Sequence, residues 1–184
     1  MALGVALGLS TFVMVWLIQP YAQTRGIPPA WFGTLWAAAH VWLAGVSLVS
    51  ARITDALGPR ATLLVCCLLI PAGYLGLAAV PSAGAVAFYL CFMTIRGLQG
   101  PIVASALQQD APEHDRASVL SLAVLLFRLA FVAAGPPIGA LVDRAGMPAA
   151  FIVLAAGFTS AGLLALRAFA RVHVGRSGSA VSVP

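Results

Sequence analysis

Six apolar stretches, each about as long as one membrane crossing, constrain this chain more than any other feature of its sequence. A hydrocarbon core of about 30 Å takes about 20 helical residues per crossing. Charged residues make up only 8% of the 184 residues, too few to coat a soluble domain of this size. The sequence therefore predicts an all-α integral membrane protein with one six-helix domain over residues 1–170. The expected spans are 3–21, 31–51, 61–80, 84–107, 117–141 and 148–170.

The basic residues predict how these spans are oriented. All ten are Arg, and the first, third and fifth connections hold only Arg25 and Arg144. The positive-inside rule places the opposite, Arg-rich side in the cytoplasm. We therefore expect an inner-membrane protein with both termini cytoplasmic and with residues 171–184 as a disordered tail. The Arg-rich side holds Arg52, Arg60, Arg116, Arg167, Arg171 and Arg176.

The composition excludes several classes of activity. The chain contains no Lys, so it has neither a P-loop lysine to hold phosphates nor a lysine for a Schiff base. The three cysteines lie inside apolar stretches, and we expect no disulfide, no metal and no cofactor. No Gly-x-Ser-Gly nucleophile occurs in a span, and Glu113-His114 is a lone pair rather than a metalloprotease motif. We therefore predict neither an enzyme nor a nucleic-acid partner.

A short pattern occurs twice: a small residue, three residues, Asp, two residues and Gly. It occupies 51–58 and recurs 88 positions later at 139–146, after the second and the fifth span. Asp and Gly are common wherever a helix ends, so a single copy carries little information. By the Arg count the copies lie on opposite sides of the membrane, and two three-helix units of opposite orientation are typical of inverted-repeat transporters. The sequence therefore predicts two inverted three-helix repeats.

Two Arg side chains are predicted to lie within the membrane: Arg128, midway through the fifth span, and Arg96, midway through the fourth. On insertion scales each costs about 2.5 to 3.5 kcal/mol at a helix centre, which disfavours contact with lipid. We expect both to face a protein or water-filled interior, and Ser121, Arg128 and Gly135 share one stripe of the fifth span. No acidic residue lies in any span. The partner of each Arg is therefore a backbone carbonyl, an anionic substrate group or a carboxylate of another chain.

Four further residues are candidates for a substrate or proton path. Trp36 and His40 share a face of the second span, with His40 near mid-membrane. A buried His can relay protons or contact a substrate because its charge changes near neutral pH, and it can equally be a hydrogen-bonded packing residue. Gln99 follows Arg96 by three positions, and Gln19 lies at the outer end of the first span, where it could line a vestibule.

The segment just after Arg128 is rich in proline and glycine. Pro136 frees a backbone carbonyl and lets the fifth span bend. Gly135 and Gly139 form a small-xxx-small pair, which lets a second helix approach closely. We therefore expect a bend and a tight helix contact next to the intramembrane Arg.

Residues 51–60 resemble the cytoplasmic motif G-x-x-x-D-R-x-G-R-R of the major facilitator superfamily of secondary transporters. Asp55, Gly58 and Arg60 match the motif. The resemblance implies that these residues, with Arg52 beside them, form a gating element on the cytoplasmic side. A charged group near a helix end could brace such a gate through the helix dipole.

Two more elements resemble the same family. Residues 96–100 are similar to the R-x-x-Q-G element of the fourth helix, which the family associates with proton coupling. Residues 131–139 partly resemble the fifth-helix element G-x-x-x-G-P-x-x-G. Residues 115–129 resemble the beginning of the family's helix eleven, which implies the C-terminal half, helices seven to twelve. Family members contain two six-helix halves, so the resemblance implies a truncated sequence or assembly with a second half.

The function implied by the resemblance is secondary active transport of a small solute across the bilayer by alternating access. The expected partners are that solute, the lipid bilayer and the second six-helix half. Both intramembrane Arg residues mildly favour an anionic solute, whereas the choice between uptake by a permease and efflux stays open. The alternative is a non-transporting membrane assembly or sensor subunit, because a half-length chain could also act as a scaffold.

Overall fold

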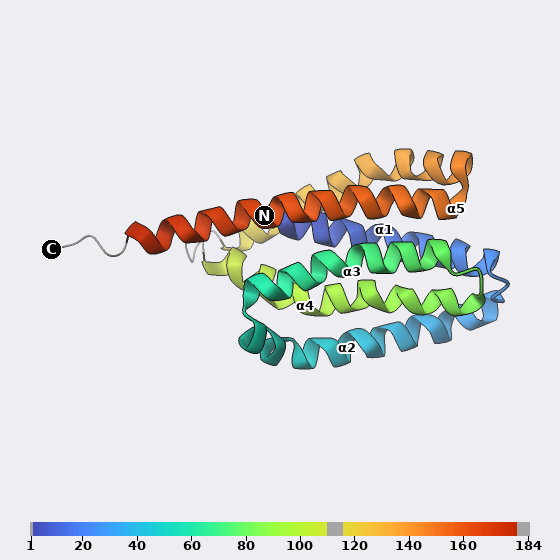
Figure 1. The fold of residues 1–184 in the computed structure, drawn as a ribbon, viewed down its shortest axis with the longest axis horizontal. Helices are drawn as coiled ribbons and strands as arrows, with labels where there is room; N and C mark the ends of the chain where they lie inside the picture. The colour runs from blue at the N-terminus through green and yellow to red at the C-terminus, as the bar shows by residue number, and fades with distance from the viewer. Residues whose placement is uncertain (1, 110–115, 180–184) are drawn as a thin grey trace.

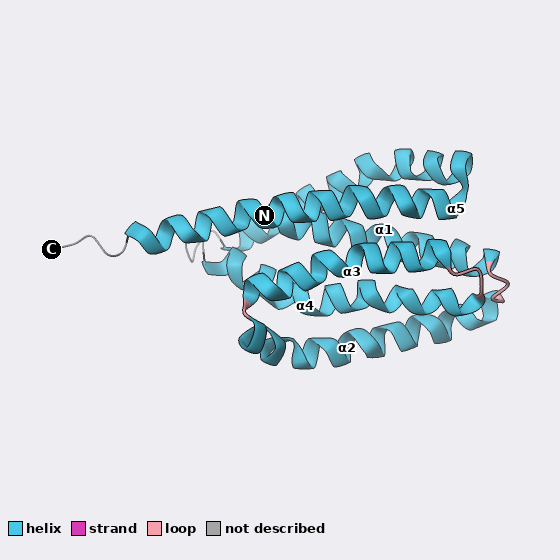
Figure 2. Ribbon diagram, in the orientation of Figure 1, coloured by secondary structure: helices cyan, strands magenta, loops and turns pink. Residues whose placement is uncertain are grey.

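The structure is a computed structural model that describes residues 2–109 and 116–179, and every regular element in these residues is a helix (Figure 1) (Figure 2). Apolar sequence favours this outcome, because a helix satisfies all its backbone hydrogen bonds internally. Prolines stand at the first position of two elements, where their missing N–H costs nothing. The elements are α1 (Ala2–Thr24), η1 (Pro29–Trp31), α2 (Phe32–Leu57), α3 (Pro59–Ala79), η2 (Ala83–Phe88), α4 (Tyr89–Gln109) and α5 (Arg116–Ser179).

Helix α5 consists of two helical arms that meet at Gly146. The backbone of Gly146 has φ 78° and ψ 163°, which is not helical. Figure 1 shows the chain reversing its direction there, so that the first arm (116–145) and the second arm (147–179) run back along each other. Residues with a side chain rarely adopt such a backbone, so glycine makes this turn possible.

The other copy of the repeated Asp-x-x-Gly pattern ends a helix in the same way. Gly58 closes α2 with φ 81° and ψ 153°, close to the values at Gly146. In Figure 1 the α2–α3 connection lies at one end of the bundle and the α5 turn at the other. The two copies therefore share a backbone conformation and lie at opposite ends of the bundle. The inverted relation between whole three-helix units stays a prediction.

The core lies between α1, α3, α4 and the second arm of α5. Tyr74 of α3 is fully buried and packs edge to face against Phe92, with the ring centroids 4.7 Å apart. Its hydroxyl donates a hydrogen bond to the backbone oxygen of Ser10, 2.8 Å away. Helix α2 packs closely on α4, because a Cβ atom at Gly97 would lie only 2.7 Å from the Val46 side chain. These contacts join α1, α2, α3 and α4 into one packed bundle.

Helix α2 and the first arm of α5 flank the core and leave much of their surface uncovered. Only 6% of the most apolar part of α2 is buried. The first arm contacts α1 through Phe127 and Phe131, which pack edge to face on Phe12. The exposed apolar residues of that arm are Leu122, Val124, Leu125, Leu126, Leu129 and Val132.

Four helical segments among the described residues are long and apolar enough to cross a membrane. They are Leu3–Thr24, Pro29–Leu57, Pro59–Ala79 and Val124–Ala168, and the last contains the Gly146 turn. The finding supports a multi-pass membrane protein, whereas six spans in two repeats stay a prediction.

Several helices extend beyond the predicted spans. Helix α2 continues to Leu57, so Arg52 and Asp55 lie in its last turns and not in a connection. Asp143 likewise lies within the first arm of α5. The predicted tail 171–184 overlaps α5 as far as Ser179, and its last five residues lie outside the described residues. Once a helix has formed, each added residue gains a hydrogen bond at little cost. The helices therefore extend past the ends of their apolar stretches.

Candidate functional site

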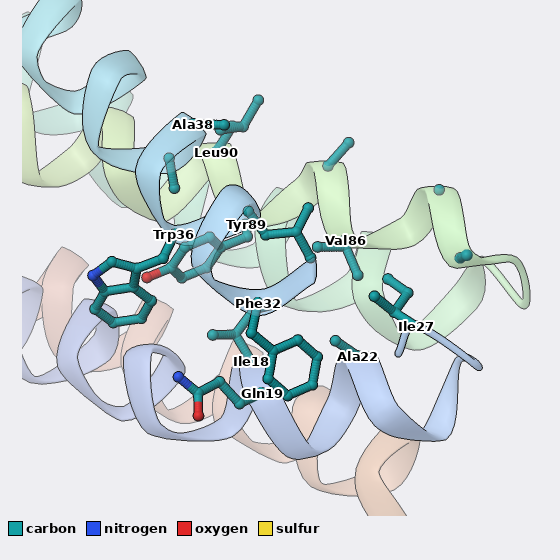
Figure 3. Close-up of a pocket in the computed structure, with 15 residues that line it drawn as sticks. Ile18, Gln19, Ala22, Ile27, Phe32, Trp36, Ala38, Val86, Tyr89 and Leu90 are labelled. Atoms are coloured by element: carbon teal, nitrogen blue, oxygen red, sulfur yellow. The ribbon is translucent and has the colours of Figure 1, made fainter. Parts of the chain in front are cut away.

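Two of the predicted path residues, Gln19 and Trp36, lie in the wall of one pocket (Figure 3). The pocket has a volume of about 340 Å³ and lies between the end of α1, the beginning of α2, η2 and the beginning of α4. Ligand pockets in proteins typically span about 300 to 1,000 Å³, so a small organic molecule fits this size. The wall is formed by Ile18, Gln19, Ala22, Ile27, Phe32, Leu35, Trp36, Ala38, Ala39, Ala83, Gly84, Val86, Ala87, Tyr89 and Leu90.

Tyr89 is a pocket residue that the sequence analysis missed. Its side chain is only 4% exposed, and its hydroxyl oxygen is buried without a hydrogen-bond partner among the described residues. Figure 3 shows this oxygen beside Trp36, on the same side of the pocket as the amide of Gln19. Its spacing of seven residues from Arg96, two helical turns, was the signal that could have identified it.

His40 is held against the pocket residue Trp36. Its Nδ1 lies 2.9 Å from the backbone oxygen of Trp36, and the two ring centroids are 5.1 Å apart. A carbonyl oxygen only accepts hydrogen bonds, so Nδ1 carries a proton and donates it. This contact gives Nδ1 a hydrogen-bond partner, as expected of a packing residue. The other ring nitrogen, Nε2, takes no part in this hydrogen bond and could still contact a substrate or exchange a proton. Both interpretations of His40 therefore remain compatible with its geometry.

The polar residues of α4 continue inward from the pocket. Arg96 is half-buried and lies within electrostatic range of the Tyr89 hydroxyl. Gln99 is also half-buried, and its Oε1 atom has no hydrogen-bond partner among the described residues. A buried polar atom without a partner costs free energy, so such atoms commonly mark places where water or a ligand binds. Helix α4 thus carries two polar atoms without a partner among the described residues: the Tyr89 hydroxyl oxygen before Arg96 and Gln99 Oε1 after it.

Arg128 lies apart from this pocket, on the first arm of α5. Its side chain is exposed and borders a shallow hollow together with Ser121, as their shared stripe predicts. The hollow and the pocket share no lining residue. A Cβ atom at Gly135 or Gly139 would meet no described atom within 4 Å. The helix contact predicted for this glycine pair is therefore not made by the described part of the chain.

The predicted gating residues lie at the end of the bundle opposite the pocket, around the α2–α3 connection (Figure 1). Arg52, Asp55 and Arg60 are exposed there. The N–H of Gly58 donates to the Thr54 oxygen at 2.8 Å, which closes α2 before the turn. All three charged side chains therefore lie at the surface of this end of the bundle.

Arg25, which the sequence analysis used only to assign orientation, closes the pocket end of the bundle. Its Nη1 donates a hydrogen bond to the Pro81 oxygen at 3.0 Å, and its guanidinium carbon lies 5.0 Å from the centroid of the Tyr21 ring. The Tyr21 hydroxyl donates to the Leu77 oxygen at 2.6 Å. The Arg25 bond ties the α1–η1 connection to the α3–η2 connection, and the Tyr21 bond ties α1 to α3.

Comparison with known proteins gives one match. A family model described as Major Facilitator Superfamily matches residues 1–135, well over half of the chain. The matched part includes the pocket, the gating motif and Arg128, and it ends just before Pro136. None of the curated proteins and none of the solved structures compared matches the chain.

Proposed function

Because this chain belongs to the Major Facilitator Superfamily, whose members are transmembrane transporters and not enzymes, we propose that it transports a small solute as one half of a twelve-helix secondary transporter. The motif resemblance of residues 115–129 supports the C-terminal half. The other half is either a further segment of the same protein or a separate chain. Transport proceeds by alternating access, with the two halves rocking about a site between them.

The exposed Arg128 is the observation that carries this proposal. It lies on a helical arm within a segment apolar enough to cross a membrane, yet its side chain is exposed. An Arg in contact with lipid at the bilayer centre costs about 2.5 to 3.5 kcal/mol on insertion scales. The surface that carries Arg128 therefore needs a protein partner or a water-filled path. A transport path between two halves supplies both.

The open surfaces of the two flanking helices support the same partner. Gly135 and Gly139 leave room beside the first arm that no described residue fills. Helix α2, on the other flank, packs on α4 with one side only, and just 6% of its most apolar part is buried. Small residues allow close helix contact within membranes. A second six-helix half could pack against both flanks and enclose a path between them.

Reconstitution tests the proposal. Three sets of proteoliposomes should be prepared: one with this chain alone, one with the second six-helix half alone, and one with both halves. A proton gradient should be imposed on each set. We expect labelled solutes from a broad panel to accumulate only when both halves are present, because a path needs two walls. Correct insertion of both halves without any accumulation would instead favour the non-transporting assembly or sensor subunit.

The orientation is proposed from the Arg distribution over the two ends of the bundle. A fluorescent protein fused to the C-terminus should fold and fluoresce, because such a reporter forms its chromophore when it is located in the cytoplasm. Alkaline phosphatase inserted between Pro81 and Ser82 should be active, because that connection lies at the Arg-poor end. The reversed pattern of the two reporters would contradict cytoplasmic termini.

A further inference from the structure

We propose that the pocket between α1, α2 and α4 binds an uncharged, mostly apolar small molecule that carries a hydrogen-bond acceptor, and that Tyr89 donates a hydrogen bond to that acceptor. We further identify this molecule as the class of solute that the transporter moves. That identification rests on the proposed function, whereas binding to the pocket does not.

The pocket wall determines the charge of the ligand. None of the residues that line it is charged, and most of them are aliphatic or aromatic. Arg96 is near Tyr89 but does not line the pocket, so an ionised ligand would lose its hydration there without direct contact with an opposite charge. An apolar ligand, in contrast, gains from leaving water. Arg128, which mildly favoured an anionic solute, lies in a separate hollow. The geometry of this pocket therefore favours a neutral ligand.

The Tyr89 hydroxyl determines where the ligand needs a polar atom. This hydroxyl belongs to a residue of the pocket wall, is buried and has no partner among the described residues, so an occupant whose acceptor reaches it would relieve the cost of its burial. A phenol hydroxyl can donate one hydrogen bond, and the positive charge of Arg96 lies within electrostatic range of it. A lipid acyl chain has no acceptor along its length, so it leaves the hydroxyl unpaired.

Two aromatic rings favour a flat ligand. Phe32 and Trp36 both line the pocket, and the Trp36 ring is held in place by His40 behind it. Rigid aromatic walls pack well against a planar molecule in offset or edge-to-face contact. Gln19 is exposed at the rim, where its amide can contact a second polar atom of the ligand. The expected ligand is therefore a small neutral aromatic ketone, amide, ester or ether.

Benzophenone is a suitable probe, because it is a neutral aromatic ketone that forms covalent bonds with nearby C–H groups under light. We expect labelling in detergent and in phosphatidylcholine liposomes to map to peptides containing pocket residues. Fluorenone, a ketone, should compete better than fluorene, a hydrocarbon of the same shape. The anion 4-benzoylbenzoate should label at least tenfold less.

The Tyr89→Phe variant tests the hydrogen bond. Because the hydroxyl has no partner, its removal should leave thermal stability unchanged or slightly higher. The concentration of fluorenone needed for half-competition should rise roughly tenfold, whereas that of fluorene should not change. Tyr74→Phe is the matched control, since it removes a core hydroxyl outside the pocket and should leave competition unchanged. Ala38→Phe, which fills the pocket from its wall, should abolish labelling there.

The inference would be overturned if the labelling were spread evenly over the exposed helices. It would also be overturned if fluorenone and fluorene competed equally well in the native chain and in the Tyr89→Phe variant. Loss of pocket labelling in liposomes alone would identify a lipid chain as the occupant and would also overturn it. Labelling that depends on Tyr89, combined with no transport of neutral aromatic ketones by the two reconstituted halves, supports the binding site and contradicts its role in transport.

Discussion

Replacing Arg128 by alanine is expected to lower the transport rate of the complete transporter by about one to two orders of magnitude, the effect of losing one charge-assisted hydrogen bond. Arg128 is exposed on a membrane-length arm and borders a hollow with Ser121, so its charge is available to the proposed path. Arg128→Lys should retain part of the activity, because it keeps the charge but loses the planar guanidinium. Initial rates in proteoliposomes measure the effect.

Membrane insertion separates this effect from misfolding. Removing an intramembrane charge makes the arm more apolar, so Arg128→Ala should insert at least as well as the native chain. Leu129→Ala is the matched control, because it is the next residue, is also exposed, and points to another side of the helix. Native transport rates in Arg128→Ala, or an equal loss in Leu129→Ala, would remove Arg128 from the path.

Replacing Gly146 by valine is expected to lower the free energy of unfolding by about 1 to 3 kcal/mol, the cost of forcing a side chain into a backbone region reserved for glycine. The two arms of α5 meet at this residue, where φ is 78° and ψ is 163°. A different turn would move the second arm away from Tyr74 and its neighbours in the core. Unfolding in detergent with increasing dodecyl sulfate measures the loss.

Gly157→Val is the matched control for the turn. Gly157 lies in the same helix, and an added Cβ atom would meet no described atom within 4 Å. Gly58→Val should cost about as much as Gly146→Val, because Gly58 has nearly the same backbone conformation. Equal stability of Gly146→Val and Gly157→Val would show that the turn does not depend on glycine.

The helices could be predicted because the bilayer core excludes other backbone structures for a single apolar stretch. A long apolar stretch without strong turn residues has to satisfy its backbone groups internally, so each stretch becomes a helix. The ends were harder to place. Helix α2 includes Arg52 and Asp55 because polar side chains at a helix end can reach water while the backbone stays helical. Both copies of the repeated pattern end at a glycine turn, although the pattern was used to predict inverted repeats and not a backbone conformation.

The candidate site was predicted only in part. Gln19 and Trp36 line one pocket, although 17 positions separate them in the chain. Tyr89 was not predicted as a pocket residue, because a Tyr near the beginning of an apolar span is typical of an interfacial anchor. Arg128 was recognised as costly in lipid, yet its separation from the pocket depends on where the first arm of α5 packs. A sequence pattern reports the face of one helix and says nothing of which helices meet.

Membrane class, helical content and the expected intramembrane position of the two Arg residues follow from local rules, because hydropathy and helix periodicity act within a few turns of chain. The pocket, the unpaired Tyr89 hydroxyl and the open flanks of α2 and α5 depend on which helices pack together. That choice is made by shape, through contacts such as Gly97 against Val46 and Tyr74 against Phe92. Residues far apart in the sequence form these contacts, so periodicity along one helix cannot reveal them.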